Sequence, residues 1–324
     1  MSHHIVFLDS EGLGPTIKLP TPSFPHTWRS YPYTRPEDIV ERLRDASIVL
    51  TCSVPLREEQ LRQLPGLRMI SLALTGTDIV DVDYCLEHGI MVTNVPGYAQ
   101  NTVAEHTIAM ILDLMRRTPH YHELLRKVHR GEAEPKNIYF DYRVRDLRGK
   151  VLGIVGSGPI ARRLAELAGA FGAQVYYQDF FGRLQGDGFI PLERLLEISD
   201  IVSINCPLTE ETRNLIDDAA FARMKRDAIL VNTGRGGIID EQALIRAMKA
   251  GRIAGAALDV VDHEPIRPDD PLFELIDRPD FILNPHVAWS SEDAMQGLID
   301  TAVDNIVQFV EGRVPEAALR REVA

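Results

Sequence analysis

The chain of 324 residues has few cysteines, no long apolar run and no excess of positive charge. Its three cysteines, Cys52, Cys85 and Cys206, are too scattered for a disulfide framework or a zinc-ligand pattern, so we expect reduced thiols, no metal site and a cytoplasmic location. No apolar run approaches the roughly 18 residues of a membrane span, and the N-terminus lacks the pattern of a signal peptide. We therefore expect neither a secreted nor a membrane-spanning protein.

The charge balance argues against a nucleic-acid partner. The sequence has 35 Lys and Arg against 47 Asp and Glu, a formal net charge of −12. Phosphate contacts favour clustered Lys and Arg, whereas a small anionic substrate needs only a few local cations or backbone amides. We expect a small-molecule substrate and no nucleic-acid or membrane partner. The length suggests two domains.

A glycine-rich turn between two apolar runs is the most informative pattern. Residues 151–155 are apolar, Gly156 and Gly158 follow, and an amphipathic helical stretch leads to a second apolar run that ends at Asp179. Glycines permit a tight turn and let the backbone approach a pyrophosphate, while exposed N–H groups at a helix start favour negative charge. The pattern predicts a dinucleotide site and hence a redox cofactor.

Further residues refine this predicted cofactor site. Ala161 replaces the third glycine of the fingerprint, and a small side chain still permits close helix–strand packing there. Pro159 suits the first helical position, where a missing N–H costs little. Asp179, about 20 residues beyond the turn, can accept hydrogen bonds from the adenosine ribose and would repel a 2′-phosphate. We therefore expect NAD, with NADP as the less favoured alternative because Arg183 lies nearby.

Short apolar runs alternate with helical patterns along nearly the whole chain, which is typical of parallel sheets covered on both faces. We predict an α/β protein with two doubly wound parallel-sheet domains, a Rossmann cofactor domain and a flavodoxin-like substrate domain, with a cleft between them. The predicted strands, besides those flanking the glycine-rich turn, are residues 5–8, 48–51, 69–73, 91–93, 201–204, 229–231, 256–258 and 281–283, and the predicted helices include 36–45, 82–88 and 102–117.

The C-terminal segment is expected to pack back on the first domain. Residues 291–312 have a helical apolar stripe that includes Met295, Leu298 and Ile306. We therefore predict a discontinuous substrate-binding domain of residues 1–100 and 289–324, and an NAD-binding Rossmann domain of residues 101–288. The proline-rich start of the chain is interpreted as a surface loop, and residues 118–150 as a polar segment.

An arginine, a glutamate and a histidine each follow a predicted strand in the second half of the chain: Arg235, Glu264 and His286. Ligands in open α/β sheets bind outside the carboxyl ends of the strands, so these side chains are candidates for one site. Reduction of a 2-keto acid requires a proton donor with a pKa near 7, a carboxylate that orients it, and a planar cation for the carboxylate of the substrate. The three residues match that requirement.

The order of these motifs resembles the D-isomer-specific 2-hydroxyacid dehydrogenase family over nearly the whole chain. Within the family, residues 5–9, residues 74–78 and Trp289 look most like the glycerate dehydrogenase/hydroxypyruvate reductase branch. The resemblance implies an NAD-dependent oxidoreductase that interconverts a small 2-keto acid and its D-2-hydroxy acid, with hydroxypyruvate or glyoxylate as the expected substrate. It also implies a homodimer through the cofactor domains. The matching stretches are residues 153–161, 206–216, 231–241, 257–265 and 285–289.

The resemblance implies a role for each matching residue. Arg235 would bind the substrate carboxylate and carbonyl, Glu264 would pair with the histidine, and His286 would act as acid and base. Asp259 would lie near the nicotinamide carboxamide. The expected substrate contacts are Leu74, Thr75, Gly76, Arg235, His286 and Trp289, and the expected cofactor contacts are Gly156, Gly158, Pro159, Ile160, Asp179, Cys206, Pro207, Thr233 and Asp259.

Two departures from the family pattern concern the substrate. Ser53 stands where many members have a basic residue, and residues 137–145 lack the tryptophan often found before the cofactor domain. Two alternatives stay open: a dinucleotide-sensing, co-repressor-like binding protein, and a short phosphoglycerate or other D-hydroxyacid dehydrogenase. Arg235, Glu264 and His286 favour an enzyme, because a pure sensor needs no proton donor.

Overall fold

The computed structural model describes residues 3–178, 186 and 188–320. The chain divides into two compact units: unit 1 comprises Met1–Ala99 and Ser290–Ala324, and unit 2 comprises Gln100–Trp289. Each unit is built on one parallel sheet with helices on its faces, which confirms the predicted fold class of two parallel-sheet α/β domains. Asp179 and Arg183, which we expect to bear on the cofactor, lie outside the described residues.

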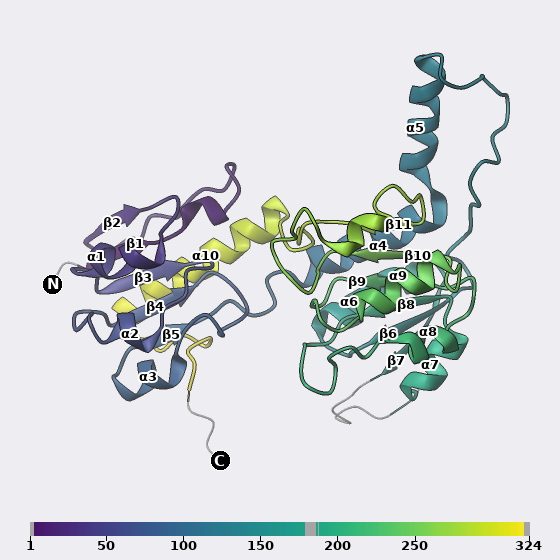
Figure 1. Cartoon of the computed structure of the whole chain (residues 1–324). Helices are drawn as coiled ribbons and strands as arrows, with labels where there is room; N and C mark the ends of the chain where they lie inside the picture. The colour runs from purple at the N-terminus through teal and green to yellow at the C-terminus, as the bar shows by residue number, and fades with distance from the viewer. Residues whose placement is uncertain (1–2, 179–185, 187, 321–324) are drawn as a thin grey trace. The chain divides into compact units, whose positions relative to one another are not determined.

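The sheet of unit 1 has five strands in the order β2-β1-β3-β4-β5 (Figure 1). Every neighbouring pair is parallel, and the order is the flavodoxin-like one, with its switch point between β1 and β3. The carboxyl ends of these two strands therefore flank the crevice where such sheets bind ligands. The strands are β1 (His3–Phe7), β2 (His26–Ser30), β3 (Ile48–Thr51), β4 (Met69–Leu72) and β5 (Met91–Thr93).

Helices cover both faces of this sheet. On one face lies α10 (Glu292–Val310), whose apolar stripe packs on Phe7 and Leu50 (Figure 1). The hydroxyl of Ser71 in β4 donates to the carbonyl of Ala302 in this helix, at 2.9 Å. The C-terminal helix thus belongs to the first sheet. The other face is covered by α1 (Ile39–Leu43), α2 (Glu58–Leu61) and α3 (Val82–Glu87), and short 3-10 helices η1 (Ser10–Gly12) and η2 (Pro36–Asp38) lie in the connections.

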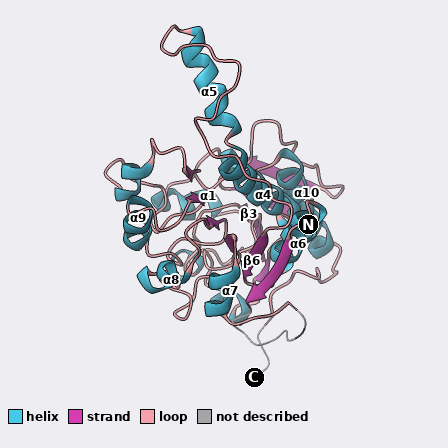
Figure 2. Ribbon diagram, turned by 90° about the vertical axis from the view of Figure 1, so that its right-hand side faces the viewer, coloured by secondary structure: helices cyan, strands magenta, loops and turns pink. Residues whose placement is uncertain are grey.

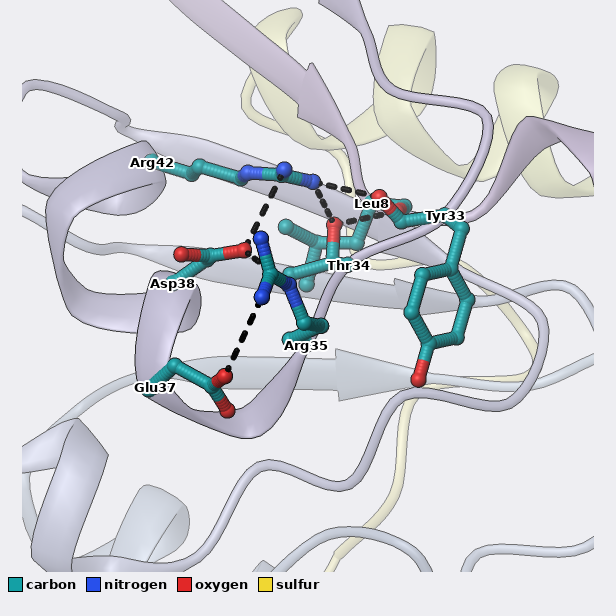
Figure 3. A network of polar contacts seen from close by, with 7 residues as sticks. All are labelled: Leu8, Tyr33, Thr34, Arg35, Glu37, Asp38 and Arg42. Atoms are coloured by element: carbon teal, nitrogen blue, oxygen red, sulfur yellow. Dashed lines mark hydrogen bonds and ion pairs between the residues drawn. The ribbon is translucent and has the colours of Figure 1, made fainter.

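The proline-rich segment is not all surface loop, as the sequence suggested, because it contains β2. The side chains of this edge strand are half-buried or exposed, so it lacks the apolar run that reveals an inner strand. A polar network fastens the chain after β2 to the end of β1 (Figure 3). Arg42 donates to the carbonyl of Tyr33 and to the hydroxyl of Thr34, both at 2.6 Å, and Thr34 donates to the carbonyl of Leu8. The network fixes the backbone at the carboxyl end of β1.

The sheet of unit 2 has six strands in the order β11-β10-β9-β8-β6-β7, again all parallel. Its switch point lies between β6 and β8, directly beside the glycine-rich turn. The described strands are β6 (Val151–Val155), β7 (Gln174–Gln178), β8 (Ile201–Ile204), β9 (Ile229–Asn232), β10 (Gly255–Leu258) and β11 (Phe281–Leu283).

Two cores sandwich this sheet. One contains the buried sides of α4 (Gln100–Arg116) and α6 (Pro159–Ala170). The other contains those of α7 (Leu192–Ile198), α8 (Asp218–Arg223), α9 (Glu241–Lys249) and the 3-10 helix η3 (Pro271–Leu275). Because both faces are covered, the carboxyl edge of the sheet is left to the loops that carry the predicted site residues.

The polar segment 118–150 contains a helix that the sequence did not reveal. Helix α5 (Thr118–His129) has no buried residue and extends away from the rest of unit 2 (Figures 1 and 2). Its apolar residues Tyr121, Leu124, Leu125 and Val128 have helical spacing, but none of them is buried within this chain. Within the described residues, no helix has both the length and the apolar character needed to cross a membrane.

Candidate active site

Gly156 begins the loops at the carboxyl edge of unit 2. Its φ is +115°, a region that favours glycine, and an added Cβ would lie 2.4 Å from the carbonyl oxygen of Asn205. Its N–H donates to the carbonyl of Gln178 at 2.8 Å. Gly156, directly after β6, therefore lies between the end of β7 and the segment that follows β8. Its backbone approaches other backbone of the protein closely, where the sequence predicted an approach to a pyrophosphate.

Gly158 differs, because a Cβ at this position would meet no atom within 4 Å. It is the N-cap of α6, with Pro159 at the first helical position, and no side chain caps this end. The N–H groups of a first helical turn have no partner within the helix and carry the positive end of its dipole. Open space in front of an uncapped helix start fits a pyrophosphate. Ile160 is half-buried, and Ala161 is buried as close packing requires.

The other predicted cofactor contacts follow β8 and β9. Cys206 is buried, which raises the pKa of its thiol to about 11, so the thiol stays protonated. Pro207 is exposed. Thr233 is buried, and its hydroxyl lies 2.8 Å from that of Thr107 in α4. Together with the turn after β6, these residues line the ends of three neighbouring strands.

His286 and Glu264 form a direct pair. Nδ1 of His286 lies 2.6 Å from Oε2 of Glu264, and the two side chains are 39% and 37% exposed. The second oxygen of Glu264, Oε1, accepts from the N–H of Val261 at 3.2 Å, which fixes the carboxylate. Because the pair uses Nδ1, Nε2 is the nitrogen that can exchange a proton with a substrate. The two residues come from segments that follow β10 and β11.

Asp259 holds the backbone around His286. Its carboxylate accepts from the N–H of Val287 at 3.0 Å and of Ala288 at 2.9 Å, and its own carbonyl accepts from the N–H of His286 at 2.8 Å. His286 has a φ of +54°, a left-handed conformation that is uncommon for residues other than glycine and that the surrounding contacts stabilise here. The side chain of Asp259 is 1% exposed. These contacts indicate that Asp259 holds the histidine loop in place, in addition to the nicotinamide contact that the resemblance implies.

His106, in α4, is a site neighbour that the sequence did not indicate. Its Nε2 lies 3.0 Å from Nδ2 of Asn284 and 3.5 Å from Oδ1 of Asp259. The residue stands in a helix with no motif around it, and its partners are more than 150 residues away in sequence. Only the packing of α4 beside β10 and β11 brings it here.

Arg235 lies on the turn after β9 and is exposed. Asn232 organises this turn: its Oδ1 accepts from the N–H of Gly234 at 3.0 Å, and its Nδ2 donates to the carbonyl of Arg235 at 2.9 Å. A Cβ on Gly236 would lie 1.9 Å from the carbonyl oxygen of Val261. The turn of Arg235 therefore packs directly on the loop that leads to Glu264.

A cavity of about 290 Å³ lies beside the His286–Glu264 pair. Apart from the acidic and histidine side chains, its walls are mainly apolar. A concave, mainly apolar surface beside a few polar groups is typical of a small-molecule site. The lining residues are Asp259, Val261, Glu264, Pro265, Ile266, Phe273, Ile276, Leu283, Asn284, Pro285 and His286.

The remaining predicted substrate contacts lie elsewhere in the chain. Leu74, Thr75 and Gly76 follow β4 in unit 1, where the carbonyl of Leu74 accepts from the N–H of Val95 at 2.9 Å. The hydroxyl of Thr75 donates to the carbonyl of Val95 at 3.1 Å. Trp289 is the last residue of unit 2 and is half-buried. Contact of these residues with a substrate at His286 stays a prediction.

Comparisons with known proteins identify the family of this chain. Residues 108–288 match the family model described as D-isomer specific 2-hydroxyacid dehydrogenase, NAD binding domain. A glycerate dehydrogenase of Methylorubrum extorquens is 42% identical over 316 residues, which cover 97% of this chain and 98% of the relative. A hydroxypyruvate reductase of Blautia hydrogenotrophica is 34% identical and covers 85% of this chain and 86% of its own.

A solved structure shares the fold of the whole chain. The TT0316 protein from Thermus thermophilus superposes with a TM-score of 0.83 at 29% identity, covering 98% of this chain and 100% of its own. The similarity therefore extends over both units and not only over the dinucleotide-binding one.

Proposed function

The chain belongs to the D-isomer-specific 2-hydroxyacid dehydrogenase family, and on that premise we propose that it reduces hydroxypyruvate or glyoxylate with His286 as the proton donor. It is an NAD-dependent oxidoreductase of 2-hydroxy and 2-keto acids. The observation that carries the proposed role of His286 is the 2.6 Å contact between its Nδ1 and Glu264. The choice of substrate is supported by the names of the two relatives, glycerate dehydrogenase and hydroxypyruvate reductase.

The cofactor fits the turn after β6 because Gly158 leaves space before an uncapped helix start. We propose that the residues following β6, β8 and β9 hold it, including Gly158, Cys206 and Thr233. When bound, NADH supplies the hydride that C2 of the keto acid receives. Addition of a hydride to C2 places negative charge on the keto oxygen, so that oxygen must also receive a proton.

His286 would deliver that proton from Nε2. The carboxylate of Glu264 at Nδ1 would keep the ring oriented through the reaction. In oxidation of the hydroxy acid the same nitrogen accepts the hydroxyl proton. Arg235 would bind the carboxylate of the substrate through its planar guanidinium, assisted by backbone amides of Leu74, Thr75 and Gly76, while Trp289 would contact the substrate side chain.

The experiment is a panel of 2-keto acids reduced with NADH and with NADPH, followed by nicotinamide absorbance. For His286→Ala we expect turnover to fall by about 100- to 10,000-fold with NADH binding retained. His263→Ala is the matched control, since this exposed histidine adjoins Glu264 in the same loop. Unchanged turnover in His286→Ala, or a loss in His263→Ala of the same size, would refute the assignment. Hydroxypyruvate and glyoxylate should be the best substrates.

We also propose a homodimer through unit 2 in the cytoplasm. All three cysteines are free thiols in the structure, as a reducing compartment favours. The projecting segment formed by α5 and the chain that follows it exposes large apolar side chains, among them Leu125 at 55%, Ile138 at 66% and Phe140 at 88%. Exposed apolar side chains gathered on one segment are typical of an interaction surface.

Light scattering after size exclusion tests the dimer. The wild type should have twice the chain mass, and Ile138→Asp with Phe140→Asp should have the mass of one chain. Phe171→Asp is the control, because Phe171 is also exposed, at 48%, but follows α6 outside the projecting segment. A wild type of single-chain mass, or a dimer unaffected by the double change, would contradict the proposal.

A further inference from the structure

The loops that carry Arg235 and Glu264 are tied together by backbone contacts. Gly236 packs against the carbonyl of Val261 so closely that no side chain fits between them. The next residue, Gly237, donates its N–H to Oδ1 of Asp262 at 2.6 Å. Arg235 precedes this contact by two residues, and Glu264 follows it by two. A shift of one loop therefore displaces the other.

Glu241 connects the contact between these two loops to helix α9. Its Oε1 accepts from the N–H of Asp262 at 2.8 Å, and it is the first residue of α9. The start of α9 is itself fixed, because the carboxylate of Asp240 accepts from the N–H of Ala243 at 3.0 Å. A chain of hydrogen bonds thus leads from Gly237 through Asp262 to Glu241, and none of them involves His286 or a proposed substrate contact.

The hydrogen bonds lie beside a narrow crevice, although Asp262 itself is exposed. Asn232, Gly236, Gly237, Glu241 and Asp262 line a crevice that has no room for a water molecule. Burial raises the pKa of Glu241 to about 7, and the negative charges of Asp262 and Asp270 act in the same direction. Near neutral pH the side chain of Glu241 is therefore partly protonated, which reduces repulsion between the neighbouring carboxylates.

We propose that Asp262 and Glu241 are positioning residues that set the spacing between Arg235 and the Glu264–His286 pair. The proposal rests on the proposed function, since it concerns the same site. A guanidinium that holds the substrate carboxylate and an imidazole that protonates its C2 oxygen act on neighbouring atoms of one small molecule. Misplacement by about 1 Å can cost about 100-fold in rate, so a device that fixes the two loops contributes directly to turnover.

The test compares substitutions that remove or keep each hydrogen bond. Asp262→Ala removes the acceptor for Gly237, and we expect kcat/KM for the keto acid to fall about 10- to 100-fold while the Kd for NADH changes less than about twofold. Asp262→Asn keeps an acceptor oxygen and should stay within about threefold of the wild type. Likewise, Glu241→Ala should lower kcat/KM by about 10- to 100-fold, and Glu241→Gln should stay within about threefold of the wild type. Asp218→Ala is the control, because this carboxylate also contacts α9, through Arg246 at 2.6 Å, but lies outside both loops.

Amide hydrogen exchange supplies a readout that does not depend on activity. In Asp262→Ala the N–H of Gly237 should exchange about tenfold faster than in the wild type, with the amides of the sheet unchanged. Wild-type kcat/KM together with wild-type exchange at Gly237 in Asp262→Ala would overturn the proposal. A wild type that reduces no 2-keto acid would refute the proposed function instead, and exchange would still decide whether Asp262 ties the loops.

Discussion

Asp9 in unit 1 and Asp259 in unit 2 are buried carboxylates, 4% and 1% exposed, that each follow a strand. Both accept hydrogen bonds from two consecutive N–H groups of the loop after a neighbouring strand. Asp9 accepts from Cys52 at 2.8 Å and Ser53 at 2.6 Å, after β3, and Asp259 accepts from the two residues that follow His286, after β11. A buried carboxylate that accepts from two backbone N–H groups fixes the loop that supplies them.

The two loops differ in what they present. The loop after β11 carries His286 in a left-handed conformation, with its ring paired to Glu264. The loop after β3 carries Ser53, whose hydroxyl donates back to Asp9 at 2.9 Å. One carboxylate therefore supports the loop of the proposed proton donor, and the other supports the loop of an exposed serine. The same local arrangement thus holds two loops of different composition, and the side chain that each loop carries decides what it can do chemically.

Among the substitutions that distinguish the loop after β11 from the loop after β3, Asp259→Ala should have the largest effect on turnover. One buried and one half-buried N–H group lose their acceptor, at about 1–3 kcal/mol for the buried one, and the loop after His286 loses two of the contacts that hold this residue at a positive φ. We expect kcat to fall about 100-fold or more, and NADH binding, measured by fluorescence titration, to weaken by a smaller factor through the nicotinamide contact proposed for Asp259. A variant that unfolds at the wild-type denaturant concentration and keeps the wild-type kcat would contradict this role.

Asp9→Ala should act on substrate affinity, with a smaller effect. The loop of Ser53 lies at the switch point of its sheet, where a bound ligand is expected, but it carries no proposed proton donor. We expect KM for the keto acid to rise about 5- to 10-fold, with kcat within about threefold of the wild type. Steady-state kinetics of the Asp9 and Asp259 variants side by side check the contrast. Loss of kcat of equal size in both would show that the loops do not divide the work in this way.

The effect of each substitution on unfolding can be measured separately for each unit by tryptophan fluorescence. The chain has two tryptophans, Trp28 in unit 1 and Trp289 in unit 2. Trp289→Phe leaves a reporter of unit 1, and Trp28→Phe leaves a reporter of unit 2. With these backgrounds, Asp9→Ala should lower the urea midpoint seen by Trp28 but not the one seen by Trp289.

The elements that the sequence predicted best are those with a continuous apolar run. Residues 48–51, 91–93, 201–204 and 281–283 are strands β3, β5, β8 and β11 with the predicted bounds. The runs of the inner strands β3 and β8 are entirely buried and those of the end strands β5 and β11 are partly buried, so composition identifies all four. Strand β2 was missed because it is a polar edge. Helix α5 was missed although Tyr121, Leu124, Leu125 and Val128 have helical spacing, because the rest of the segment is polar.

The site was predictable to the level of residue types but not of contacts. Arg235, Glu264 and His286 follow strands and have the chemistry that keto-acid reduction requires, and the structure pairs two of them directly. The support of the histidine loop by Asp259 spans 28 residues or more, and the approach of His106 to Asn284 spans 178. These contacts exist only because β10 and β11 are neighbours with α4 packed beside them, which depends on the whole fold.

Glu241→Gln should have the smallest effect, a change in the pH dependence of the stability of unit 2. The pKa of Glu241 is raised to about 7 from its ordinary value of 4.5, so between these values the folded state binds a proton that the unfolded chain has released. Stability from this group is therefore greatest below about pH 4.5 and falls as pH rises to about 7. Because the side chain is partly exposed, solvent screening limits the change to about 1 kcal/mol. Glutamine does not titrate, so the variant should lose this dependence.

The measurement is the urea midpoint of the Trp28→Phe background at about pH 5 and about pH 8, with and without Glu241→Gln. The variant should gain stability relative to its parent as pH rises, because the parent must ionise Glu241 beside Asp262 and Asp270. The same substitution in the Trp289→Phe background should leave the unit 1 transition unmoved at both pH values. A gain seen equally by both reporters would mean that the two units unfold together, and the division of labour between Asp9 and Asp259 would then have to be tested by kinetics alone.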